Sequence, residues 1–167
     1  LRSAGHDVDV YTTTGSVRDC IQIDTNLYEI PSGSTYRLPK RIGKNYSAVR
    51  HLPDLKQYDV VHVYGLGTAP SIVLRSPVPV LGTINNLDWV CINWTGYLRA
   101  GCPTYGFRQA ISLAYRDGYG PLIPLKLALE GTFKRIVKNI DHFTVQTEGM
   151  KSILTRCGYN ESSLTVV

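Results

Sequence analysis

The stretch VPVLGTINN, Val78 to Asn86, indicates the fold of this chain. Val78 to Ile84 is a short, mainly apolar run without polar alternation, and such runs are typical of strands buried on both faces of a parallel sheet. Asn85 and Asn86 follow directly. The stretch therefore predicts a buried strand that carries amide side chains at its carboxyl end.

Runs of the same character occur along the rest of the chain, at Val8 to Thr13, Asp59 to Gly65, Asp141 to Thr147 and Leu164 to Val167. Helical patterns separate them, at Thr68 to Arg75, within Phe107 to Lys138, and at Glu148 to Cys157. This alternation predicts an α/β domain with a Rossmann-like, doubly wound, mainly parallel sheet, whose ligands lie beyond the carboxyl ends of the strands. We expect residues 30–56, rich in Pro, Gly, Ser and Lys, to be an irregular connection within that domain.

Residues 1–167 have the length and composition of one soluble globular domain, with 43% hydrophobic and 19% charged residues. No apolar run reaches the roughly 18 to 20 residues that cross a bilayer, and the first residues lack a signal-peptide pattern, so we expect a cytoplasmic location. LRSAGHDVDVY reads as a last helical turn followed by a strand, and the chain ends within a strand. We therefore expect a fragment that is truncated at both ends and lacks its first strand.

The net charge of +5 and the pI of about 9.1 favour anionic partners. The segment from Arg99 to Ile140 contains seven basic and two acidic residues. Its excess of positive charge equals the net charge of the whole chain. A solvated helix face is one explanation, and an anionic membrane surface or a phosphorylated acceptor is the other. The candidate contacts are Arg99, Arg108, Lys126, Lys134 and Arg135. We do not expect nucleic-acid binding, because no helix-turn-helix, RNP or zinc pattern accompanies these residues.

Other chemical signatures are scarce. The four cysteines form no C-x-x-C pair and no zinc-finger spacing, so we expect no metal site; Cys91 and Cys102 flank one loop and are the pair able to meet. The chain lacks the P-loop, G-x-S-x-G and H-E-x-x-H motifs. His62 lies inside an apolar strand, which favours a core histidine over a catalytic base.

Polar residues follow three of the expected strands, and the parallel sheet would bring them to one edge. Each has a structural alternative, because glycines and asparagines close turns, and Asp88 and Thr147 are good helix caps. Asparagine amides suit sugar hydroxyls or phosphate oxygens, and tryptophans suit sugar faces or lipid. The candidate substrate-binding residues are Tyr64, Gly65, Asn85, Asn86, Asp88, Trp89, Trp94, Thr147 and Glu148.

Four blocks in this order resemble the N-terminal domain of family-4 retaining glycosyltransferases with the GT-B fold: RSAGHDVDVYTT, YDVVHVYGLGTAP, SPVPVLGTINN and FKRIVKNIDHFTVQTEGMKSILTRCGYNESSLTVV. The resemblance covers nearly the whole chain and is weakest over Asp24 to Lys56. It implies two Rossmann-like domains, of which the first mainly holds the acceptor and the second holds a nucleotide sugar, without a required metal. This chain would then bind no cofactor itself, and a UDP- or GDP-linked donor would occupy the missing C-terminal domain.

The resemblance also assigns individual residues. Tyr64 and Gly65 look like the strand-end pair that borders the cleft, and Thr147-Glu148 resembles the Ser-Glu that opens a later helix. Asn85 falls where many members carry a histidine, which makes it the candidate catalytic position, although an amide cannot titrate. WVCINWTGYLRAGC is similar to the W-x-x-C...C acceptor loop of some members. The glycine-rich loop after the first strand and the second domain with its two spaced glutamates are absent.

The resulting hypothesis is the acceptor-binding half of a glycosyltransferase that moves a hexose, with retention, to a glycan or lipid-linked acceptor. The fragment alone is expected to be inactive, and peripheral contact with an anionic membrane is expected from the basic segment. The alternative is a non-catalytic Rossmann-like module that binds a carbohydrate or a protein, which asparagine at position 85 slightly favours.

Overall fold

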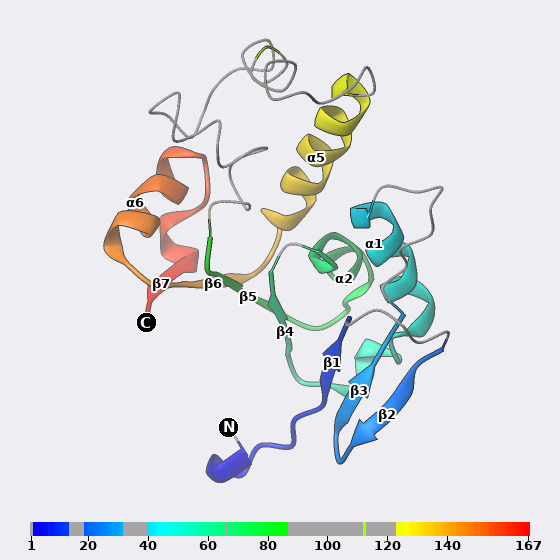
Figure 1. The fold of residues 1–167 in the computed structure, drawn as a ribbon. Helices are drawn as coiled ribbons and strands as arrows, with labels where there is room; N and C mark the ends of the chain where they lie inside the picture. Colours follow the sequence, from blue (N-terminus) through cyan, green and yellow to red (C-terminus); the bar gives the residue numbers. More distant parts are fainter. Residues whose placement is uncertain (1, 14–18, 32–39, 66, 87–111, 113–122) are drawn as a thin grey trace.

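The computed structural model describes residues 2–13, 19–31, 40–65, 67–86, 112 and 123–167 (Figure 1). Its central feature is a parallel sheet in the order β4-β5-β6-β7, formed by Val61–Tyr64, Val80–Ile84, His142–Val145 and Leu164–Val166. Every neighbouring pair in this sheet is parallel. The strands expected from the sequence at these four places are therefore confirmed, as is the parallel sheet.

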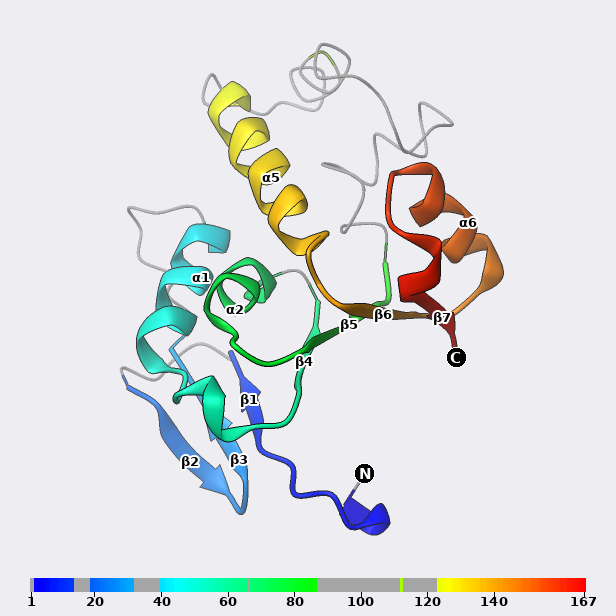
Figure 2. The same ribbon diagram turned by 180° about the vertical axis from the view of Figure 1, so that it is seen from behind.

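Helices connect these strands in the alternating order that the sequence predicts. Helix α2 (Ala69–Arg75) follows β4, α5 (Ile123–Val137) precedes β6, and α6 (Glu148–Arg156) precedes β7. In both views, α1, α2, α5 and α6 lie on the same side of the sheet (Figures 1 and 2). The arrangement is consistent with the predicted Rossmann-like α/β fold, with helices covering one face of the sheet in the part of the chain that the structure describes.

The core lies between this sheet and its helices. Alternate strand residues point into it, and the row Val63, Gly82, Phe143 and Leu164 crosses all four strands in register. Ile72, Val137 and Leu154 pack on the row from α2, α5 and α6. Gly82 is needed there because a Cβ at this position would lie 2.9 Å from Cδ1 of Phe143. Glycine in the strand thus leaves room for the buried Phe143 ring on the neighbouring strand.

A second, smaller sheet has the order β1-β3-β2, formed by Val10–Thr12, Leu27–Glu29 and Ile21–Asp24. β1 pairs in parallel with β3, and β2 pairs with β3 in an antiparallel hairpin. The strand expected at Val8 to Thr13 is confirmed, but it does not join the four-stranded sheet. The β2–β3 hairpin was not predicted from the sequence.

The expectation that residues 30–56 are irregular is wrong for most of their described part. Helix α1 spans Lys40–His51, and the 3-10 turn η2 spans Leu55–Gln57. Where the side chains of α1 are described, polar contacts hold its inward face: Asn45 is buried, and its amide donates to the Gly67 carbonyl at 2.7 Å. Arg75 donates to the carbonyls of Ala48 and Val49 near the end of the helix.

The first described residues form a short turn that ends at a glycine. The 3-10 turn η1 (Arg2–Ala4) precedes Gly5, whose φ of 84° places it in the left-handed region, as expected for a helix stop.

Among the helices that the structure describes, none combines the length and apolar character needed to traverse a bilayer.

Candidate functional site

The structure brings Tyr64 and Asn85 together at the carboxyl edge of the four-stranded sheet. Tyr64 ends β4 in register with Thr83, and Asn85 lies two residues beyond Thr83 on the same face of the sheet. The Asn85 Nδ2 donates a hydrogen bond to the Tyr64 hydroxyl at 3.1 Å, while the Tyr64 side chain is 70% exposed. The two strand ends that the sequence singled out therefore form one polar pair.

The oxygen of the same amide is left without a partner. Asn85 Oδ1 is buried and, within the described residues, accepts no hydrogen bond. A buried carbonyl oxygen without a donor costs free energy, about 1 to 3 kcal/mol, so a hydroxyl or N–H group placed there would be bound favourably. The chemistry that this pair offers is hydrogen bonding: Oδ1 accepts, and the exposed Tyr64 hydroxyl still has a proton to donate.

Glycine shapes the loop after β4. At the start of the following helix, α2, a backbone N–H group already has a hydrogen-bond partner within the chain. Gly65 has a φ of 87°, which favours glycine, and a Cβ there would meet nothing within 4 Å. At the start of α2, the Ser71 N–H donates to Asn45 Oδ1 at 2.9 Å. This contact occupies a backbone donor that a ligand at the helix start would otherwise use.

Thr147 has the structural role that the sequence left open as an alternative. Its hydroxyl accepts a hydrogen bond from the Met150 N–H at 3.1 Å, which makes it the N-cap of α6. Glu148 is exposed in the first turn of the same helix, where a carboxylate favours the positive end of the helix dipole. Asn86 is exposed beside Asn85.

The side of the sheet that carries Tyr64 and Asn85 also holds a hydrogen-bonded row that the sequence analysis missed. His62 Nε2 lies 2.7 Å from Thr83 Oγ1, and Thr83 Oγ1 lies 2.8 Å from Thr144 Oγ1. His142 Nε2 makes the equivalent contact with Thr165 Oγ1 at 2.8 Å. The signal was present as polar residues at every second position of three strands.

The expectation that His62 is a core histidine is wrong. Its side chain is exposed on the face opposite the helices, because Val61 and Val63 are the β4 residues that point toward the helices. Burial of part of the ring still lowers the pKa of His62 below its ordinary value. It is therefore a partly covered surface imidazole that contacts a threonine.

Several sequence candidates fall outside the described residues: Asp88, Trp89, Trp94, Arg99, Arg108 and the pair Cys91 and Cys102. Lys126 lies within α5, and Arg135 in the last turn of α5 is exposed. Lys134 is only 9% exposed, which contradicts its assignment to a charged outer surface. Its position on the side of α5 that packs toward the core explains this, since Val137 one turn later is fully buried.

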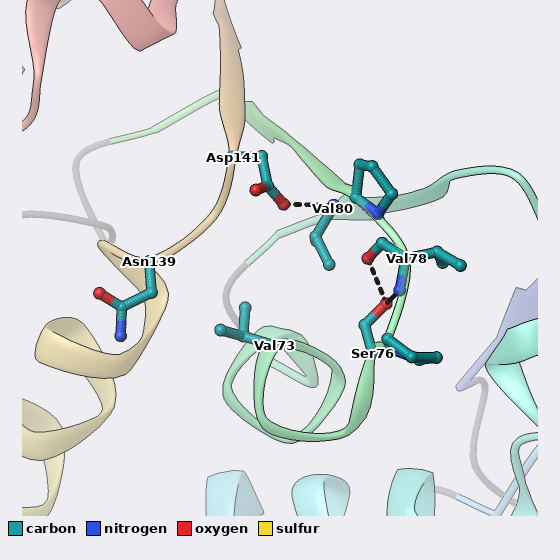
Figure 3. A pocket seen from close by; sticks show the side chains of 8 residues that line it. Val73, Ser76, Val78, Val80, Asn139 and Asp141 are labelled. Atoms are coloured by element: carbon teal, nitrogen blue, oxygen red, sulfur yellow. Dashed lines mark hydrogen bonds between the residues drawn. The ribbon is translucent and has the colours of Figure 1, made fainter.

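A hollow of about 370 Å³ lies at the opposite edge of the sheet, near the amino ends of β5 and β6 (Figure 3). Two of its polar side chains make hydrogen bonds to the backbone. Asp141 Oδ2 accepts a hydrogen bond from the Val80 N–H at 2.7 Å, and Ser76 Oγ donates to the Val78 carbonyl at 2.7 Å. These contacts fix the entries to the strands. The hollow is therefore separate from the Tyr64–Asn85 pair, and the fold accounts for its Ser76 and Asp141 side chains.

Over the described part of the chain, no three His, Cys, Asp or Glu side chains gather closely enough to hold a metal ion. The chemistry on display is that of neutral hydrogen-bonding groups at the carboxyl ends of β4 and β5, on a Rossmann-like parallel sheet. This places the chain in the class of Rossmann-like α/β domains, in which ligand sites are generally found at the carboxyl ends of the strands.

The sequence model of the family described as Glycosyltransferase Family 4 matches residues 1–167, the whole of the chain. The chain belongs to this family, and the sheet flanked by helices is consistent with a GT-B N-terminal domain. No curated protein matches closely enough to serve as a relative. Membership supports glycosyl transfer as the general activity of the protein to which this domain belongs.

Proposed function

We propose that this chain is the acceptor-binding half of a sugar-nucleotide-dependent glycosyltransferase that transfers a hexose, with retention of configuration, to a glycan or lipid-linked acceptor. The observation that supports it is the Tyr64–Asn85 pair at the carboxyl edge of the sheet. Membership of the family supports the type of reaction. A UDP- or GDP-linked sugar would be held by a second domain, so the 167-residue chain alone would be inactive.

The pair suits a hydroxyl-rich ligand better than an anion. Asn85 Oδ1 accepts hydrogen bonds and carries no positive charge, and the Tyr64 hydroxyl is neutral near pH 7. Sugar hydroxyl groups both donate and accept, so they complement these two atoms. Stabilisation of the departing diphosphate requires preorganised donors or cations and is assigned to the other domain.

The excess of basic residues between Arg99 and Ile140 supports a further part of the proposal, which is an anionic acceptor or a contact with the cytoplasmic face of the membrane. Arg135 is exposed at the end of α5, and Arg99, Arg108 and Lys126 belong to the same stretch of sequence. Each such residue close to an anionic membrane contributes about 1 kcal/mol at physiological ionic strength. Sedimentation of the full-length protein with phosphatidylserine vesicles at low salt tests this. Equal sedimentation with neutral vesicles would remove the membrane proposal.

The transfer itself is tested with the full-length enzyme and radiolabelled UDP- and GDP-hexoses. We expect transfer or slow hydrolysis of one donor, and a loss of about 2- to 10-fold in kcat/KM for Asn85→Ala, the value of one neutral hydrogen bond. The matched control is Asn160→Ala, which removes an amide from the start of the exposed 3-10 turn η4 (Glu161–Ser163) and should leave kcat/KM unchanged. Carbohydrate binding without turnover of any donor would favour the non-catalytic module instead.

A further inference from the structure

A third polar residue follows the carboxyl edge of the four-stranded sheet, beside Asn85. β5 and β6 are parallel neighbours, and their register ends with Ile84 opposite Val145. One residue further along, the same register places Gln146 opposite Asn85, at about the 4.8 Å spacing of neighbouring strands. Because alternate residues of a strand share a face, Gln146 lies on the face of Thr144, which is also the face of Asn85.

The fold does not depend on the Gln146 side chain. Gln146 is exposed and lies outside the apolar core. The helix that begins just after it is capped by the Thr147 hydroxyl, which accepts from the Met150 N–H, so the start of α6 does not use the Gln146 amide. An amide in this position is therefore available to a ligand at the sheet edge.

The two strand ends that carry Asn85 and Gln146 are tied together just below these residues. Thr83 Oγ1 lies 2.8 Å from Thr144 Oγ1, and these threonines precede Asn85 and Gln146 by two residues on the same face. The contact fixes the lateral spacing of the strand ends. A ligand that bridges Asn85 and Gln146 would then lose less free energy to the ordering of the protein.

Together, Tyr64, Asn85 and Gln146 form a polar row, the edge row, that spans three neighbouring strands. At its centre, Asn85 Oδ1 is buried and accepts no hydrogen bond within the described residues. On one side, the Tyr64 hydroxyl accepts from Asn85 Nδ2, so its own proton is available to a ligand. On the other side, Gln146 offers two N–H donors and a carbonyl oxygen. The edge row therefore places an acceptor between donors.

The edge row has no positive charge. The tyrosine hydroxyl and both amides are neutral near pH 7. Glu148, two residues after Gln146, is exposed in the first turn of α6, where its carboxylate already uses the favourable field of the helix dipole and repels a second anion. These groups suit an uncharged hydroxyl better than a phosphate.

We propose that Gln146 is a further binding residue and that Gln146 and Asn85 together hold two adjacent hydroxyl groups of a neutral sugar in the acceptor. One hydroxyl donates to Asn85 Oδ1, and the neighbouring hydroxyl accepts from the Gln146 Nε2. The inference rests on the proposed function, because it takes the acceptor to be a sugar. It adds the chemistry that the edge row selects, which is an uncharged ring with vicinal hydroxyl groups.

Binding of the methyl pyranosides of glucose, mannose and galactose to the full-length protein tests this inference, with affinities from ligand-observed NMR titrations. We expect Gln146→Ala to weaken binding of the tightest glycoside by about 2- to 10-fold, the value of one neutral hydrogen bond. The matched control is Gln57→Ala, which removes an exposed glutamine from η2, ahead of the amino end of β4, and should leave the affinity unchanged.

Monodeoxy analogues of the same glycoside separate a direct contact from an effect on the fold. The analogue that lacks the hydroxyl bound by Gln146 should bind the native protein about 2- to 10-fold more weakly than its parent. It should bind Gln146→Ala as tightly as it binds the native protein, because the contact is already absent. If Gln146→Ala weakens the parent and every deoxy analogue by the same factor, the residue acts only through the fold and the proposal is wrong.

Donor turnover distinguishes failure of this inference from failure of the proposed function. If Gln146→Ala leaves glycoside binding unchanged while the enzyme turns over a UDP- or GDP-hexose, the inference fails and the proposed function stands. Glycoside binding that depends on Gln146, without turnover of any donor, would support the sugar contact and favour the non-catalytic module. Gln146-dependent binding of glycerol phosphate in place of the neutral glycosides, or no binding of any glycoside, would overturn the inference.

Discussion

Replacing Gly82 with alanine should destabilise the fold, mainly because the new side chain would meet the Phe143 ring. The new Cβ would lie 2.9 Å and 3.1 Å from Cδ1 and Cε1 of Phe143, and 3.3 Å from Cδ1 of Ile140. The Phe143 ring has little room to withdraw, since it is 1% exposed and the Tyr159 ring packs against it edge-on, with centroids 5.3 Å apart. We expect a loss of about 1 to 3 kcal/mol, the usual range for overpacking a core.

The measurement is thermal unfolding followed by circular dichroism, with urea titration for the free energy. At about 2 to 4 °C per kcal/mol for a chain of this size, the melting temperature of Gly82→Ala should fall by about 2 to 12 °C. Gly131→Ala is the matched control: this glycine lies within α5, and an added Cβ meets nothing within 4 Å. That variant should gain about 0.5 to 1 kcal/mol from helix propensity.

A double-mutant cycle identifies the cause of the effect. In a Phe143→Leu background the aromatic edge is gone, so alanine at position 82 should cost less than it does in the native background. A Gly82→Ala variant as stable as the native chain would refute the reasoning. An unchanged cost in the Phe143→Leu background would show that the Ile140 contact, rather than the ring, is responsible.

Three further changes follow from contacts described above. Thr147→Ala removes the N-cap of α6 and should cost about 1 kcal/mol in urea unfolding, while Thr147→Ser should retain most of it. Asn45→Ala leaves the Ser71 N–H and the Gly67 carbonyl without this partner and should cost about 1 to 3 kcal/mol, with Ser47→Ala in the same helix for comparison. The lowered pKa of His62 means that the unfolded chain binds its proton more tightly. The contribution of His62 to stability is therefore complete above pH 6.5 and is lost as the pH falls through the folded-state pKa; His62→Gln should flatten that part of the stability profile.

The main sheet could be predicted from the sequence because each strand is a short, mainly apolar run, although the described structure buries one face of these strands more than the other and not both as expected. The run that ends at Asn85 became β5, and the polar residue that follows it contacts Tyr64 as expected for neighbouring parallel strands. The hairpin could not be predicted in the same way, because every residue of β2, Ile21–Asp24, is exposed and its pairing depends on tertiary context.

Helix α1 and His62 show two different reasons why a sequence pattern does not predict every feature of the fold. The described inward side of α1 includes Asn45 and Ser47, whose burial depends on hydrogen bonds to partners far away in the sequence, and a sequence pattern does not show such burial. His62 was assigned to the core because a continuous apolar run suggests burial on both faces. The helices described in the structure cover only the side of Val61 and Val63, and a sequence pattern does not show which face of a strand is covered.

The hydrogen bonds that link His62, Thr83 and Thr144 can run in either of two directions along the row. When the Nε2 of His62 carries a proton, it donates to Thr83, whose own hydroxyl proton is then free to point at Thr144; with the proton on Nδ1, each donor and acceptor can reverse. A charged imidazole permits only the first arrangement. Proton uptake on β4 would thereby orient a hydroxyl dipole two strands away on β6, without any movement of the backbone.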